Sequence, residues 1–191
     1  MEKKVIKSIV SEYLKDYPNE NEKIEKLNKF LKTNSKQAMA DWNNAKGHLT
    51  AGGFLYCKST KKFLVMYHKD LKIYSYPGGH CEAKDTTPLQ RAVIELKEET
   101  GVQNFNVVAK NTNKEIPFDI DIHYIGYNPR VNMPEHYHYD FRYFFVVDKE
   151  FNVKLDEEEM SNYKWISKKE LSKDVNFGKI IEKLNPLLKT L

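Results

Sequence analysis

The segment 77–102 constrains the fold of this chain more than any other part of the sequence. A glycine-rich loop at 77–79 leads into a stretch with helical periodicity that carries three glutamates, Glu95, Glu98 and Glu99. At about 100° per residue, the three carboxylates fall within about 100° of one another on a helix surface. Like charges at this spacing repel by a few tenths of a kcal/mol per pair, roughly. A divalent cation reverses that cost, because hard cations bind carboxylate oxygens. The pattern predicts half of a metal site.

The ends of this helix are marked in the sequence. Thr87 is a favourable N-cap, Pro88 suits the first helical turn, and Gln90 predicts a capping box. Gly101 is a typical C-terminal stop. Apolar residues recur between these signals at spacings of three and four, at Leu89, Ala92, Val93 and Leu96. An amphipathic helix with a solvated acidic face is the simpler interpretation. The glycine loop before it and the Thr-Gly stop after it favour the metal site.

The same segment resembles the Nudix hydrolase signature. That signature consists of Gly, five residues, Glu, seven residues, Arg-Glu, an apolar residue, any residue, Glu-Glu, any residue, Gly and an apolar residue. Gly79 fits the opening glycine, and residues 95–102 fit the closing half completely. The chain looks most like a subgroup of bacterial Nudix proteins with a helical leader and a late His-x-His-x-Asp-x-Arg strand.

The resemblance implies a fold and an activity. The implied fold class is a Nudix-type α/β/α sandwich with a mixed central sheet. The implied activity is metal-dependent hydrolysis of a diphosphate linkage in a small molecule, a nucleoside diphosphate joined to another group. Mg²⁺, with Mn²⁺ able to replace it, is expected on Glu95, Glu98, Glu99 and a backbone carbonyl near Gly79. Glu98 or Glu159 is expected to act as general base.

Three departures from the signature bear on activity. The interval between Gly79 and Glu95 is one residue too long, the middle glutamate falls on Asp85, and the signature arginine is replaced by Ile94. Arg91 lies on the carboxylate side of the helix and is the candidate to replace that arginine as a catalytic partner. The alternative is a catalytically impaired Nudix-fold module that binds or senses a nucleotide. The complete carboxylate set favours the enzyme.

A second polar pattern lies further along the chain. Strand alternation places His136, His138, Asp140 and Arg142 on one face. Asp119, Asp121 and His123 alternate in the same way upstream, so the two segments can pair as a hairpin. A wet sheet face, a phosphate-binding surface and a zinc site are the alternatives. Substrate binding by these four residues, on the same side as Glu95 and Glu99, is the prediction.

Other candidates stand near these patterns. Glu159 precedes Trp165 by six residues, a spacing at which some Nudix enzymes place a metal-binding glutamate. Trp165 itself is expected in the core. Lys84 is a further candidate to neutralise substrate phosphate, beside Arg91 and Arg142.

Composition excludes several classes of protein. The 191 residues are 40% apolar and 30% charged, with a net charge of +4. The small, mixed excess of positive charge predicts no nucleic-acid partner. Cys57 and Cys81 are the only cysteines and form neither a paired metal motif nor a disulfide framework. No apolar run is as long as that of a signal peptide or a membrane span, so a cytoplasmic protein without a membrane partner is expected.

Periodicity divides the chain into two regions. Residues 1–46 are predicted as a helical extension, with helices at 2–16 and 20–33 that pack on the main body or, in a homodimer, on a second subunit. Residues 47–191 are predicted as the Nudix domain. Strands are expected at 49–57, 62–68, 72–76, 104–110, 118–127, 137–147 and 163–167, and helices at 88–100, 168–173 and 177–190.

Overall fold

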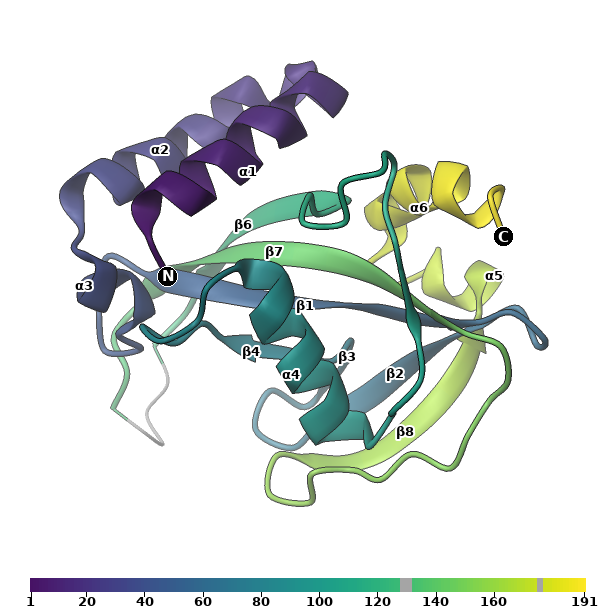
Figure 1. Cartoon of the computed structure of the whole chain (residues 1–191). Coiled ribbons are helices and arrows are strands. Elements are labelled where there is room, and N and C mark those ends of the chain that lie inside the picture. The colour runs from purple at the N-terminus through teal and green to yellow at the C-terminus, as the bar shows by residue number, and fades with distance from the viewer. Residues whose placement is uncertain (128–131, 175–176) are drawn as a thin grey trace.

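The computed structural model of the chain describes residues 1–127, 132–174 and 177–191 (Figure 1). Among these residues, no helix combines the length and the apolar character needed to cross a membrane. The helices are α1 (Lys3–Asp16), η1 (Pro18–Glu20), α2 (Asn21–Thr33), α3 (Lys36–Ala40), α4 (Pro88–Thr100), α5 (Lys168–Leu171), η2 (Gly178–Ile180) and α6 (Ile181–Leu188). The strands are β1 (His48–Cys57), β2 (Lys62–His68), β3 (Ile73–Ser75), β4 (Gly78–His80), β5 (Asn106–Val108), β6 (Asp119–Ile125), β7 (His136–Val147) and β8 (Met160–Ser167).

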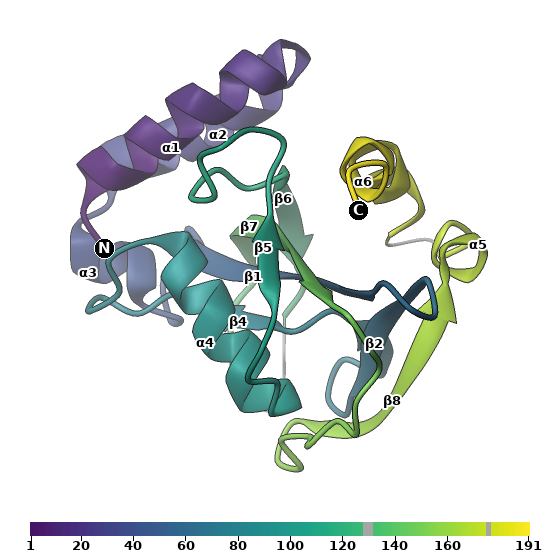
Figure 2. The ribbon, with the colours of Figure 1, turned by 45° about the vertical axis from the view of Figure 1, so that its right-hand side comes forward.

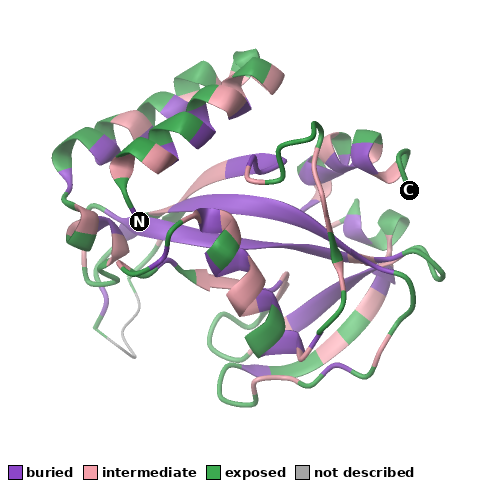
Figure 3. Ribbon diagram, in the orientation of Figure 1, coloured by how far each residue is buried: buried purple, intermediate pink, exposed green. Residues whose placement is uncertain are grey.

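One mixed sheet forms the centre of the molecule. Its main path runs β3-β2-β1-β7-β5, while β4 pairs with β1, β6 with β7 and β8 with β2. β1 and β7 run parallel over ten paired residues, from His48 opposite His138 to Cys57 opposite Val147. The two strands are buried along nearly their whole length (Figure 3). Central strands are buried in this way because both faces of the sheet are covered, although the first half of β7 also carries polar side chains.

Helices cover both faces of this sheet, as Figure 2 shows. Alternate residues of β1 and β7, such as Ala51 and Phe141, join one core with α4, α1 and α2. The residues between them, such as Phe54 and Phe144, join a second core with the C-terminal helices, including Leu184. The predicted α/β/α sandwich with a mixed central sheet is confirmed.

The N-terminal helices belong to the first core. The ring of Phe30 on α2 stacks on Tyr139 of β7, with centroids 4.3 Å apart. Ile6, Ile24 and Leu27 are fully buried in the same cluster. Of the two predicted packing modes, contact with the main body is the one that the structure shows.

Two short elements were not predicted. α3 lies in the segment expected to be a polar link, and the Ser35 hydroxyl caps it by accepting the N–H of Ala38 at 3.1 Å. β4 consists of Gly78, Gly79 and His80, residues without a strong strand preference. It exists because it pairs with residues 50–52 of β1, a contact that local sequence does not encode.

Candidate active site

Local capping residues determine where α4 begins and ends. The Thr87 hydroxyl accepts the N–H of Gln90 at 3.1 Å, Pro88 is the first helical residue, and Gly101 ends the helix with φ of 72°. The predicted capping box is only half formed, because the Gln90 side chain accepts from the N–H of Thr86 instead of Thr87. A left-handed glycine after the last turn satisfies helical carbonyls without steric strain.

Glu95 and Glu99 point from α4 toward the glycines of β4. The N–H of Gly78 donates to Oε2 of Glu99 at 3.0 Å. A Cβ atom at Gly79 would lie 2.6 Å from the carboxyl carbon of Glu95, so the glycine lets this carboxyl group approach the strand closely. Glu98, the third predicted ligand, is exposed at the edge of this pair. The predicted metal residues therefore form one group where α4 meets β4.

Burial disfavours the charged form of Glu95 and of Glu99 and so raises the pKa of both. Burial raises the pKa of Glu95 to about 7; Arg91 opposes this, and the charges of Glu98 and Glu159 add to it. Burial raises the pKa of Glu99 to about 9, and Glu95 and Glu159 raise it further against the opposing hydrogen bond from Gly78. Carboxylates this close and this buried need a proton or a cation between them.

Arg91 lies beside Glu95 and is nearly buried, with its side chain 5% exposed. It forms a two-pronged ion pair with Asp85 through Nε and Nη2, both at 2.9 Å. Its Nη2 also contacts Glu82 at 2.7 Å, and its Nη1 donates to Glu95 Oε1 at 3.3 Å. A forked guanidinium held at this many points fixes the orientation of what it contacts. Arg91 thus links Glu95 of α4 to Asp85 and Glu82 in the loop before the helix.

Glu159 and Lys84 lie at the rim. Glu159 is the last residue before β8; its carbonyl accepts the N–H of Lys69 at 2.9 Å, and its charge acts on both Glu95 and Glu99. Trp165 packs at the edge of the core, as predicted. Lys84 is 76% exposed and pairs with Glu82 at 2.8 Å. Lys84 stays a proposed phosphate contact.

The polar stripe on β7 lies on the other side of the sheet. His80 of β4 lies opposite Thr50 of β1, and the Thr50 hydroxyl donates to Asp140 at 3.0 Å. The side chains of these three residues therefore lie on the same face of the sheet. Gly79, the neighbour of His80, faces Glu95 on the opposite side. The prediction that the stripe shares a side with Glu95 and Glu99 is therefore wrong. Strand alternation predicted a common face within β7 but could not predict which face α4 covers.

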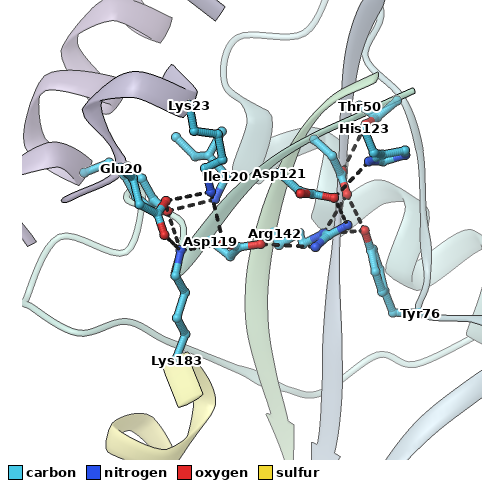
Figure 4. Close-up of polar contacts among 12 residues, drawn as sticks. Glu20, Lys23, Thr50, Tyr76, Asp119, Ile120, Asp121, His123, Arg142 and Lys183 are labelled. Atoms are coloured by element: carbon cyan, nitrogen blue, oxygen red, sulfur yellow. Dashed lines mark hydrogen bonds and ion pairs between the residues drawn. The ribbon is translucent and has the colours of Figure 1, made fainter. Parts of the chain in front are cut away.

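The Arg142 guanidinium donates to three carboxylates, one on β7 and two on β6 (Figure 4). Its Nε donates to Asp140 at 2.9 Å, its Nη1 to Asp119 at 3.1 Å and its Nη2 to Asp121 at 2.7 Å. Tyr76 accepts a further hydrogen bond from Nε at 2.7 Å. A guanidinium that is 8% exposed and surrounded by three carboxylates does not face a phosphate. The predicted substrate contacts at Arg142 and Asp140 are corrected to a buried network that joins β6 and β7.

The histidines of the stripe contact His48, a residue that sequence reasoning missed. His136 is 2% exposed, and its ring lies beside His138 and His48. Its predicted contact with substrate stays a prediction. His48 was missed because the predicted strand began one residue later. The alternation of His48 with Thr50 could have indicated that both side chains lie on one face of the strand. The pairing of His48 with His138, 90 residues later, is set by the register of β1 against β7 and has no such local signal.

Comparison with known proteins identifies the family. A family model described as "NUDIX domain" matches residues 46–187. The chain therefore belongs to the Nudix family. The match includes the segment 77–102.

Three relatives illustrate the likeness. A protein of Lactococcus lactis subsp. cremoris called "Probable DHNTP pyrophosphohydrolase" is 34% identical over 95 residues, which cover 49% of this chain and 51% of that protein. This chain thus spans about half the length of that curated relative. A Nudix-family hydrolase from Clostridium perfringens has a TM-score of 0.55 at 25% identity, covering 75% of this chain and 98% of that one. An Ap4A hydrolase from C. elegans has a TM-score of 0.56 at 16% identity, with the same coverage, and shows the fold alone.

Proposed function

We propose that this chain is a Mg²⁺-dependent pyrophosphohydrolase that cleaves a diphosphate linkage in a nucleoside diphosphate derivative. The observation that carries the proposal is the buried pair Glu95 and Glu99 against the backbone of Gly78 and Gly79. The relative called a probable DHNTP pyrophosphohydrolase supports a phosphoric anhydride substrate.

The carboxylate group fits a hard divalent cation. Its donors are oxygens only, and burial raises the pKa of both inner carboxyl groups. Such a site favours Mg²⁺, with Mn²⁺ as a substitute. Glu95, Glu98, Glu99 and the backbone near Gly79 would hold it. When bound, the ion neutralises the diphosphate and lowers the pKa of a water for attack on phosphorus.

The residues of the chain have separate tasks in this proposal. Arg91 holds Glu95 through Nη1 at 3.3 Å and acts as a positioning residue. Glu98 and Glu159 are the exposed carboxylates beside the buried pair, so one of them takes the proton of the attacking water. Lys84 is exposed next to the helix start and offers charge to the leaving phosphate. The contact of Arg91 with Glu95 favours the enzyme over the impaired binding module.

A panel of nucleotide diphosphate compounds tests the proposal. Each compound is incubated with the protein and Mg²⁺, and released phosphate is measured after phosphatase treatment. We expect Glu98→Gln and Glu99→Gln to lose turnover by orders of magnitude, while the folded structure persists. A general base contributes about 10²- to 10⁴-fold. Glu159→Gln is compared with Glu158→Gln, an exposed neighbour in the same acidic run. Full activity of both the Glu98→Gln and the Glu99→Gln variant would show that α4 does not contribute to the metal site.

A further inference from the structure

Four histidine rings gather on the sheet face opposite α4. His48 on β1 lies directly opposite His138 on β7, and His136 is two residues away on the same face. The ring centroids are 4.7 Å apart for His48 and His136, 4.7 Å for His48 and His138, and 5.1 Å for His136 and His138. His80 of β4 lies 4.4 Å from His48. Three strands that are distant in sequence contribute to one cluster.

The nitrogens of these rings converge. One nitrogen from each of His48, His136 and His138 lies within 4.8 Å of the others. Both nitrogens of His48 and Nε2 of His136 are buried and make no hydrogen bond within the described part of the chain. Buried polar atoms without a partner are costly and infrequent in proteins, so each calls for an explanation.

The hydrogen bond of His136 determines which nitrogen is free. Its Nδ1 lies 2.7 Å from the carbonyl oxygen of Pro134. Because a carbonyl only accepts, Nδ1 carries the proton and Nε2 keeps its lone pair toward the cluster. Backbone carbonyls orient metal-binding histidines in this way. His123 makes an equivalent contact at the border of the cluster, where its Nδ1 lies 2.9 Å from Asp121.

The cluster suits a soft or borderline metal better than an anion. Its candidate donor atoms are imidazole nitrogens, and three of them lie within 4.8 Å of one another. Neutral imidazoles bring no positive charge to a phosphate, whereas they are the form that binds transition metals.

We propose that His48, His136 and His138 bind one Zn²⁺ ion. Zn²⁺ favours three or four nitrogen ligands in a tetrahedral arrangement. This site is distinct from the carboxylate group, because His80 and Gly79 project to opposite faces of β4. The ion joins β1 and β7, the two strands at the centre of the sheet.

Calorimetric titration of Zn²⁺ into chelator-treated, dialysed protein tests the site, with Mg²⁺ in excess throughout. We expect one Zn²⁺ per chain and no competition from Mg²⁺, which binds imidazole poorly. His138→Gln should weaken Zn²⁺ binding by more than the roughly 10- to 100-fold that loss of an outer hydrogen-bond partner costs. His68→Gln is the matched control, since His68 lies on β2 and outside the cluster. Glu99→Gln should retain Zn²⁺ binding.

A second measurement needs no variant, so it holds even where a substitution impairs folding. In wild-type protein with ¹⁵N-labelled histidine, Zn²⁺ should shift the ring nitrogen resonances of His48, His136 and His138 and leave those of His68 unchanged. Two results would overturn the proposal. One is an unchanged set of cluster resonances at saturating Zn²⁺. The other is Zn²⁺ binding that is lost in Glu99→Gln and kept in His138→Gln, which would assign the ion to the carboxylates.

Discussion

Arg91 and Asp85 form the most enclosed ion pair beside the carboxylate group. Their side chains are 5% and 1% exposed, and the guanidinium meets the carboxylate through two hydrogen bonds of 2.9 Å. The Asp85 carboxylate also accepts the N–H of Glu82 at 2.6 Å. Because a lone buried charge is far more costly than a buried pair, the two residues depend on each other.

Removing one partner of this pair should cost more than removing both. We expect Arg91→Met to lower the free energy of unfolding by about 3–5 kcal/mol, since Asp85 is left unpaired. The double variant Arg91→Met, Asp85→Asn should recover part of that loss. Urea unfolding followed by circular dichroism measures all four members of the cycle. Strictly additive losses would show that the pair does not act as a unit.

Glu99 gives the metal-free protein a distinctive pH dependence. Its pKa of about 9 lies above the ordinary value of 4.5, so the folded state binds more protons than the unfolded state between those two values. Stability rises with pH only where the unfolded state binds more protons, so here it falls. In EDTA, the free energy of unfolding should decrease as pH rises from about 4.5 to about 9.

The matched comparison for this prediction is Glu99→Gln. The amide cannot ionise, so the decrease over the same pH range should become shallower, and the remaining slope reflects Glu95, whose pKa is about 7. Mg²⁺ should stabilise wild type increasingly toward high pH, because the cation replaces the protons. Equal slopes for wild type and Glu99→Gln in EDTA would contradict the raised pKa of Glu99.

At the scale of elements, β4 separates two groups of ligands. The Gly79 backbone faces the carboxylates of α4, while the His80 side chain faces the histidines of β1 and β7. A strand of two glycines and a histidine lets α4 approach closely on one side and places a ring on the other. β4 therefore lies between the two proposed metal sites, with Gly79 facing the carboxylates and His80 facing the histidines.

A single methyl group at β4 should disturb the carboxylates. The Cβ of Gly79→Ala would lie 2.6 Å from the Glu95 carboxyl carbon, so the flexible end of Glu95 must move. We expect Mg²⁺ affinity and turnover to fall while the thermal midpoint changes little. Gly126→Ala is the control, since nothing lies within 4 Å of its added Cβ. Unchanged Mg²⁺ affinity in Gly79→Ala would contradict the close approach as a requirement of the site.

At the scale of the whole molecule, polar contacts join both ends of the chain to the sheet. Lys183 of α6 donates to Asp119 of β6 at 2.6 Å and to the Tyr13 hydroxyl of α1 at 2.7 Å. The backbone N–H of Ile120 donates to the same hydroxyl at 3.2 Å, and Glu20 is also paired with Lys183. With the shared apolar core, these contacts make the N-terminal helices part of the fold.

A core substitution in α2 should therefore destabilise the entire protein. Leu27 is fully buried, and Leu27→Ala is expected to cost about 2–5 kcal/mol. Circular dichroism of the helices and Trp165 fluorescence in a Trp42→Phe background should show one shifted transition. Exposed Lys32→Ala on the same helix is the control, with an expected change within about 0.5 kcal/mol. An early helical transition with unchanged Trp165 fluorescence would make residues 1–46 an independent unit.

The sequence by itself determined the local elements and one half of the candidate active site. Thr87, Pro88 and Gly101 act within one or two turns of α4, so the helix and its three glutamates could be read from adjacent residues. The strands β1, β2, β6 and β7 follow from alternation and apolar runs in the same way, and the pairing of β6 with β7 was also predicted. The family resemblance supplied the order of layers that periodicity alone does not give.

Only the tertiary structure decided which distant residues meet. β4 has no strand signal of its own and forms because β1 presents a free edge. The parallel register of β1 and β7 brings His48 to His138, and the choice of face directs both away from Glu95. The ion pairs of Arg142 likewise depend on the register of β6 against β7. Registers and faces are selected by burying the whole apolar pattern at once, and no short segment carries that information.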